Sequence, residues 1–174
     1  WLPDLKTLNP LLSGEVFKAE DYPKVAKKAL RWMAEQSPLV FTDKDGQKKI
    51  TSGLIVRHLA LPGRFSDTEM VLRWFSKNLQ GKALLSLMSQ YTPVSKSKTA
   101  QHTAFPNRHL EQAEYDTLLA LLEELCIEDG FYQELIQDTE WLPDFTNTQP
   151  FSSSLATPIW HWKTGFILNG SSKN

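Results

Sequence analysis

The chain has 174 residues, of which 41% are hydrophobic and 22% are charged, and its 19 basic and 20 acidic side chains give a net charge of −1. This balance is typical of a globular domain and disfavours both a disordered chain and a polybasic nucleic-acid binder. No apolar run approaches the roughly 18 residues of a membrane helix, and no signal-peptide pattern is present. We therefore expect a cytoplasmic protein that binds neither membranes nor nucleic acids.

The first elements are a strand and a helix. Residues 1–8 are predicted to form a short strand, which Asn9 and Pro10 end. The opening residues resemble the middle of a buried strand, so we expect the chain to be cut from a longer protein. Residues 22–36 have the apolar spacing of an amphipathic helix. Its predicted apolar face consists of Val25, Ala29, Trp32 and Met33.

A hairpin and a buried strand follow. An Asp-Gly pair between two β-prone stretches predicts a hairpin over residues 39–53. Residues 54–61 form an almost continuous apolar run in which only Arg57 and His58 are polar. A run that is apolar on both faces is typical of a parallel strand covered by helices.

The next segments continue this alternation. Ser66 and the acidic residue three positions later predict a capping box at the start of a helix over residues 67–79. Residues 82–91 are predicted to form a strand, residues 111–127 a leucine-rich helix, and residues 131–136 one more strand.

Strands that alternate with helices indicate an α/β fold with a parallel sheet. Residues 92–110 and 137–174 carry no clear periodicity. We expect one body over residues 1–136, with the aromatic-rich residues 137–174 as an extended segment that packs on it. A docking surface formed by that segment is the alternative.

Ligands bind at the carboxyl ends of parallel strands, so polar residues there are the candidates for a site. Asp4 and Lys6 share one face of the first strand, where they either form a structural ion pair or hold a zwitterionic ligand. Arg57 would be costly to bury in the middle of a strand without a partner. It therefore indicates either a salt bridge to a neighbouring strand, for example to Asp4, or an anionic ligand.

Further candidates follow from the same alternation. His58 points to the opposite face from Arg57 and is predicted to be a hydrogen-bonded core histidine. Ser86, Met88 and Gln90 share a face of a later strand, and Tyr91 follows at its tip, so these residues are predicted to line a pocket.

Other polar or reactive residues carry weaker signals. His102 and His109 are expected at the surface, and Lys96 and Lys98 in a solvated loop. Cys126 is the only cysteine. Its leucine-rich surroundings predict a small buried hydrophobe, and alone it cannot form an intramolecular disulfide or a multi-thiolate metal site.

Several segments, in their order and spacing, carry a resemblance to a known family. The longer ones are GLIVRHLALPG at 53–63, SLMSQYTP at 86–93, GFYQEL at 130–135 and EWLPDF at 140–145. Shorter elements are Asp4-Leu5-Lys6, Asn9, Arg57, Pro62-Gly63 and Leu87-Met88. Together they resemble the pyruvate formate-lyase activating enzyme-related branch of the radical SAM superfamily over most of the chain.

The resemblance implies a partial (β/α)₆ TIM-like barrel with parallel strands. This chain would be its later half, followed by an aromatic C-terminal extension. In the family, a CxxxCxxC motif binds a [4Fe–4S] cluster and a glycine-rich segment holds S-adenosylmethionine. Neither is present here, so the resemblance implies that the cluster ligands lie upstream of Trp1 and that the chain alone is inactive.

For the full-length protein, the resemblance implies an oxidoreductase that cleaves S-adenosylmethionine reductively. The product is a 5′-deoxyadenosyl radical that abstracts hydrogen. Asp4 and Lys6 resemble the aspartate and lysine of the fourth strand that face cofactor and substrate, and Arg57 resembles a fifth-strand arginine that contacts S-adenosylmethionine. The implied cofactor-binding residues in this chain are Asp4, Lys6, Arg57, Met88, Gln90 and Tyr91.

The resemblance leaves the substrate open, with a protein as one option. Tyr91 stands where activases have a histidine, which argues against a glycyl-radical enzyme as the substrate. Two other classes stay open: a non-catalytic α/β protein-interaction module, and a fragment of a TIM-barrel hydrolase or lyase. A half-barrel would expose the edge of residues 1–8, so these residues are expected either to pair with a second copy of the chain or to lie exposed.

Overall fold

The computed structural model describes residues 1–44, 46–93, 104–136, 160–161 and 165–166. The chain divides into two compact units, residues 1–136 and residues 137–174. In the second unit, β6 (Trp160–His161) and β7 (Gly165–Phe166) form an antiparallel pair. The predicted packing of residues 137–174 on the first unit concerns a segment that lies mostly outside the described residues.

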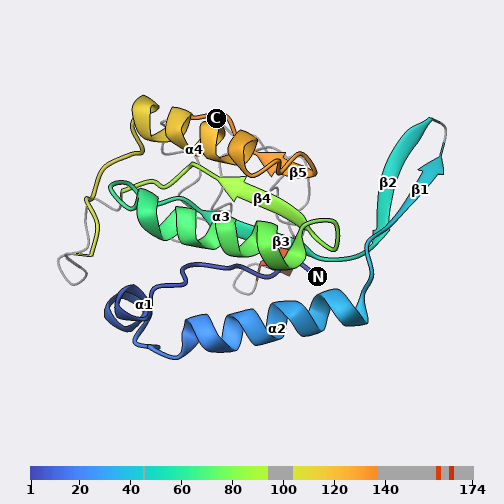
Figure 1. The fold of residues 1–174 in the computed structure, drawn as a ribbon, viewed down its shortest axis with the longest axis horizontal. Coiled ribbons are helices and arrows are strands. Elements are labelled where there is room, and N and C mark those ends of the chain that lie inside the picture. The colour runs from blue at the N-terminus through green and yellow to red at the C-terminus, as the bar shows by residue number, and fades with distance from the viewer. Residues whose placement is uncertain (45, 94–103, 137–159, 162–164, 167–174) are drawn as a thin grey trace. The chain divides into compact units, whose positions relative to one another are not determined.

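The centre of the first unit is a parallel three-stranded sheet (Figure 1). Its strands are β3 (Ile55–Leu59), β4 (Leu84–Met88) and β5 (Gly130–Tyr132), and they are neighbours in chain order. Parallel neighbours need long crossover connections, and here each connection contains a helix. The predicted α/β class and parallel sheet are confirmed.

Residues 1–5 run parallel to β3 on the side away from β4. Arg57 donates its backbone N–H to the carbonyl of Pro3 at 2.9 Å. The backbone N–H of Leu5 donates to the carbonyl of Arg57 at 2.8 Å, so that Asp4 and Arg57 form a parallel bridge. In place of the predicted strand over residues 1–8, the structure therefore has a single isolated bridge at Asp4.

Proline explains why this pairing is short. The N–H of Ile55 donates to the carbonyl of Trp1 at 3.0 Å, which extends the contact toward the N-terminus. The next bond of a parallel ladder would run from residue 3 to the carbonyl of Ile55, and Pro3 has no N–H to donate.

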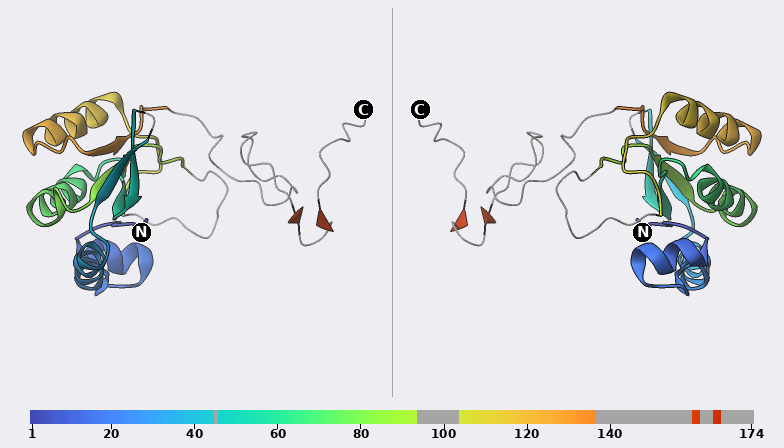
Figure 2. Two further views of the ribbon diagram at one scale, coloured as in Figure 1. Left: turned by 90° about the vertical axis from the view of Figure 1, so that its right-hand side faces the viewer. Right: turned by 90° about the vertical axis from the view of Figure 1, so that its left-hand side faces the viewer.

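The described residues of the first unit form four helices: α1 (Pro10–Phe17), α2 (Tyr22–Gln36), α3 (Phe65–Leu79) and α4 (Gln112–Glu124). Figure 2 shows α2, α3 and α4 on the same side of the sheet. The predicted helices over 22–36, 67–79 and 111–127 are therefore confirmed, with small shifts at their ends. None of the helices among the described residues combines the length and apolar character needed to cross a membrane.

The hydrophobic core lies between this helical layer and one face of the sheet. Side chains with at most 2% exposure in it include Leu5, Leu30, Val56, Val71, Leu72, Phe75 and Leu85. On the other face of β3, Arg57 is exposed and Leu59 is half-buried. The predicted parallel strand within residues 54–61 is confirmed, and in the described part of the chain α2, α3 and α4 cover one of its faces (Figure 2).

The predicted hairpin is confirmed. The strands β1 (Val40–Lys44) and β2 (Gln47–Ser52) pair antiparallel and extend away from the helical layer (Figure 1). Gly46 in the turn has φ 73°, a conformation that glycine adopts at little cost.

Two helix starts differ from the predictions. Asn9 and Pro10, which were predicted only to end a strand, begin α1. The Asn9 side chain accepts hydrogen bonds from two backbone N–H groups of the first turn, and Pro10 occupies the first helical position. The predicted capping box at Ser66 is wrong. The helix α3 begins at Phe65 after Arg64 and has no side-chain cap.

The buried face of α2 also differs from the predicted one. Val25 and Trp32 are 56% and 53% exposed, while Leu30 is 2% exposed and Ala34 is also buried. The buried stripe is therefore rotated by one residue from the predicted one. Trp32 instead contacts Trp1 edge-to-face, with ring centroids 6.3 Å apart.

This rotation is testable with a matched pair of substitutions on α2. Leu30→Ala should lower the free energy of unfolding by about 2–4 kcal/mol, because it leaves a cavity in the core. Val25→Ala should change it by less than about 0.5 kcal/mol, as expected for an exposed position. Urea unfolding followed by circular dichroism measures both, and a larger loss for Val25→Ala would contradict the observed face.

Candidate functional site

His58 lies on the helical side of β3. Its Nδ1 atom is 2.7 Å from the carbonyl oxygen of Leu5, and its Nε2 atom is 3.0 Å from the Thr68 hydroxyl. Burial, with the side chain 2% exposed, lowers the pKa of His58 to about 4. The prediction of a hydrogen-bonded core histidine is confirmed.

The lowered pKa of His58 makes stability depend on pH. The unfolded chain takes up the His58 proton near pH 6.5 and the folded chain only near pH 4, so the free energy of unfolding should fall between these values and level off below them. Over this pH range the free energy of unfolding should fall by about 3 kcal/mol in total. His58→Gln should flatten this region of the stability curve and His109→Gln should not. An unchanged slope in His58→Gln would contradict the assignment.

Arg57, the residue before His58 on β3, lies on the open face of the sheet. Its Nε atom is 2.8 Å from Oδ1 of Asp4, and the Lys6 Nζ atom is 3.0 Å from Oδ2 of the same carboxylate. The predicted salt bridge from Arg57 to Asp4 is confirmed, and so is the ion pair between Asp4 and Lys6. These three side chains are named the ionic cluster below.

A tyrosine from α2 fixes the backbone under the ionic cluster. The hydroxyl of Tyr22 donates to the carbonyl of Asp4 and accepts from the backbone N–H of Lys6, both at 2.9 Å. Burial raises the pKa of Tyr22. The hydroxyl therefore stays protonated and donating at neutral pH, which keeps the backbone between Asp4 and Lys6 in place.

The ionic cluster forms one end of a pocket of about 290 Å³. This pocket lies where residues 1–5, β3 and β4 reach their carboxyl ends. Its lining comprises Asp4, Lys6, Val16, Phe17, Arg57, Leu59, Leu61, Met88, Tyr91 and Phe105. Five of the six implied cofactor-binding residues thus line one pocket. The sixth, Gln90, is half-buried and does not line it, and neither does Ser86, which was also predicted to line a pocket.

The ionic cluster carries an excess of positive charge, because one carboxylate faces two cations. Asp4 engages Arg57 only through the Nε atom, and no hydrogen bond joins the two Nη atoms of Arg57 to the residues that the structure describes. A guanidinium with an open edge binds carboxylate or phosphate groups well.

The opposite wall of the pocket is aromatic. The rings of Tyr91 and Phe105 meet edge-to-face with centroids 5.4 Å apart. The hydroxyl of Tyr91 donates to Oδ1 of Asn107 at 3.2 Å, and the carbonyl of Ala104 accepts from Nε of Arg64. The described end of the segment after β4 is therefore packed and hydrogen-bonded.

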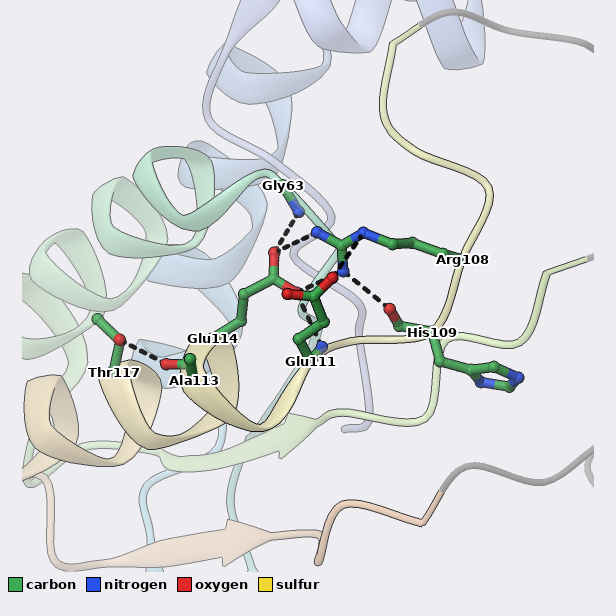
Figure 3. A network of polar contacts seen from close by, with 7 residues as sticks. All are labelled: Gly63, Arg108, His109, Glu111, Ala113, Glu114 and Thr117. Atoms are coloured by element: carbon green, nitrogen blue, oxygen red, sulfur yellow. Dashed lines mark hydrogen bonds and ion pairs between the residues drawn. The ribbon is translucent and has the colours of Figure 1, made fainter.

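Four hydrogen bonds to the carboxylate of Glu114 hold residues 108–111, near the end of the segment that follows β4 (Figure 3). Glu114 on α4 accepts two from the Arg108 guanidinium at 2.7 and 3.0 Å, one from the backbone N–H of Gly63 at 2.6 Å, and one from that of Glu111 at 2.8 Å. The hydrogen bonds from Arg108, chiefly, lower the pKa of Glu114 to about 2. We name this group of residues the Glu114 clamp.

The Glu114 clamp was not predicted, because residues 92–110 have no clear periodicity and Gly63 is distant in sequence from the other two partners, Arg108 and Glu111. The one signal in the sequence is the acidic residue at 111 followed three positions later by Glu114. The structure shows that these two form the capping box of α4.

Glu114→Gln tests the clamp. The lowered pKa of Glu114 means that its contribution is present above pH 4.5 and is lost as the pH falls toward 2. At pH 7 the substitution should cost about 1–2 kcal/mol of unfolding free energy, after allowance for solvent screening. The difference from the wild type should shrink below pH 4.5.

The matched control for this substitution is Glu123→Gln, an exposed position on the same helix. It should leave the unfolding free energy within about 0.5 kcal/mol of the wild type. Equal effects of the two substitutions at pH 7 would contradict the clamp.

The prediction for Cys126 is wrong. Cys126 follows the end of α4 with φ 50° and its side chain is exposed. The leucines that suggested burial belong to the helix, which ends two residues earlier.

Of the other candidates, His109 is half-buried, and His102, Lys96 and Lys98 lie outside the described residues. Among the described residues, no group of three or more His, Cys, Asp or Glu side chains forms a metal site.

Comparison of the chain with protein-family models, with curated proteins and with solved structures finds no match.

Proposed function

We propose that residues 1–136 are the later part of a TIM-like β/α barrel of a radical SAM enzyme similar to pyruvate formate-lyase activating enzymes. The observation that carries this proposal is the winding of the sheet. The parallel segments lie side by side in the order in which they occur along the chain: residues 1–5, β3, β4 and β5. The helices α2, α3 and α4 lie on one side of them (Figure 2). Barrels wind in this way, whereas doubly wound sheets reverse the strand order and carry helices on both faces.

The position of the pocket supports the same proposal. Binding sites of β/α barrels lie at the carboxyl ends of the strands, and the pocket is lined by Leu59 and Met88, the last residues of β3 and β4, and by Leu61 just beyond β3. The open face of β3, with Arg57 and Leu59, would then face the interior of the barrel.

The residues present fit one implied cofactor and not the other. A [4Fe–4S] cluster is held by several thiolates, and this sequence has one cysteine, exposed beyond α4. The proposal therefore requires cluster ligands from residues outside the printed sequence, and no step through the cluster is assigned to this chain.

The ionic cluster fits the carboxylate of S-adenosylmethionine, the cofactor that supplies the radical chemistry of this family. In the proposed enzyme, Arg57 and Lys6 would hold that carboxylate or neighbouring polar groups, and Asp4 would orient both cations. The apolar wall of the pocket would exclude water from the reacting groups.

The genomic sequence upstream of the Trp1 codon tests the proposal most cheaply. We expect the reading frame to continue upstream and to encode CxxxCxxC. An initiator codon directly before Trp1, with no such motif, would contradict the proposal.

The printed chain should bind S-adenosylmethionine weakly or not at all by calorimetry, because most cofactor contacts are assigned to other residues. In the longer chain with its cluster reconstituted, Arg57→Gln should weaken S-adenosylmethionine binding about tenfold or more, the effect of losing one charge-assisted contact. Lys24→Gln, at an exposed position on α2, is the control. Tight binding by the printed chain would contradict the assignment of contacts.

A second candidate function is a non-catalytic protein-interaction module. Trp1, Leu2, Val25 and Trp32 are all more than half exposed, and the first of these lies on the edge of the sheet beside β3. Exposed apolar residues beside a strand edge are typical of docking surfaces and of self-association. The same edge would pair with an earlier strand in the proposed barrel, so the upstream sequence separates the two candidates.

A further inference from the structure

The pocket is apolar beyond its ionic cluster. Val16 and Phe17 come from α1, Leu61 follows β3, and Tyr91 and Phe105 form the aromatic wall. These side chains offer one hydroxyl and otherwise only carbon atoms to a ligand, and that hydroxyl is bonded to Asn107. Such walls favour an apolar group over a sugar or another polar group.

This apolar wall is held in place before any ligand arrives. Phe105 packs in a small cluster of its own with Leu12 and Ala104, against which Leu61 and Tyr91 lie. The Glu114 clamp ties the following residues to Gly63 (Figure 3). A wall that is ordered in advance loses little conformational freedom on binding.

The ionic cluster defines the other end of the ligand. Its net positive charge and the open Nη edge of Arg57 match a single anionic group, and a planar carboxylate fits a guanidinium edge best. The volume of about 290 Å³ limits the ligand to a small molecule.

We propose that this pocket binds a small monocarboxylate with an apolar or aromatic body. The carboxylate lies against Arg57 and Lys6, and the body lies against Tyr91 and Phe105. This binding does not rest on the proposed function; in the proposed enzyme the acid and the carboxylate of S-adenosylmethionine would compete for Arg57 and Lys6. The methionyl end of S-adenosylmethionine also joins a carboxylate to an apolar chain, so the test must separate the two sources.

The test is an NMR titration of the ¹⁵N-labelled printed chain with four probes: 3-phenylpropionate, propionate, 3-phenylpropan-1-ol and L-methionine. We expect 3-phenylpropionate to bind with a Kd on the order of 1 mM and at least tenfold more tightly than propionate or the alcohol. It should also bind more tightly than L-methionine, whose ammonium group adds a third cation to the ionic cluster. Tighter binding of L-methionine, equal binding of all probes, or no binding would overturn the proposal.

Substitutions locate the two ends of the ligand. Phe17→Ala should weaken the binding of 3-phenylpropionate several-fold and leave the binding of propionate unchanged. Leu11→Ala, at an 81% exposed position on the same helix, should change the affinity for neither acid. Arg57→Gln should weaken the binding of both acids and leave the binding of the alcohol unchanged. Equal effects of the two α1 substitutions would place the ligand elsewhere.

The two proposals fail separately. Absence of the upstream cysteine motif would overturn the proposed radical SAM enzyme and leave the binding of the acid intact. Loss of selective acid binding would overturn this inference and leave the barrel proposal standing.

Discussion

The contact between residues 1–5 and β3 determines the arrangement of the rest of the site. Backbone hydrogen bonds on both sides of Arg57 fix Asp4 directly opposite it. The alternation of the strand then sends the two polar side chains of β3 in opposite directions. Arg57 meets the carboxylate of Asp4, and His58 meets the carbonyl of Leu5, so one short pairing satisfies a cation on one face and an imidazole on the other.

The two faces of the sheet therefore have different roles. The face with His58 is buried under α2, α3 and α4, where a charge would be costly, and the imidazole stays neutral at physiological pH. The face with Arg57 carries the ionic cluster and the pocket. Tyr91 and Phe105 complete that pocket, and the Glu114 clamp holds residues 108–111, which follow Phe105 along the chain.

Features governed by local periodicity were predictable from the sequence. The alternation on β3 placed Arg57 and His58 on opposite faces, and the expected partner of Arg57, Asp4, is the observed one. The boundaries of elements were less predictable where a residue is compatible with two structures. Pro10 is an example, because proline ends strands and also occurs at the first position of helices. The buried face of α2 depends on tertiary packing, because both Val25 and Leu30 are apolar and only the position of the helix on the sheet selects Leu30.

Amide hydrogen exchange tests the docking of residues 1–5 on β3 most directly. The N–H groups of Ile55 and Arg57 donate to residues 1–5, whereas the N–H of Ala60 donates to Met88 on β4. Protection of Ile55 and Arg57 comparable to that of Ala60 is the result that this arrangement predicts. Rapid exchange at Ile55 and Arg57 beside a protected Ala60 would show that residues 1–5 are not docked, and it would contradict the ionic cluster and the pocket built on it.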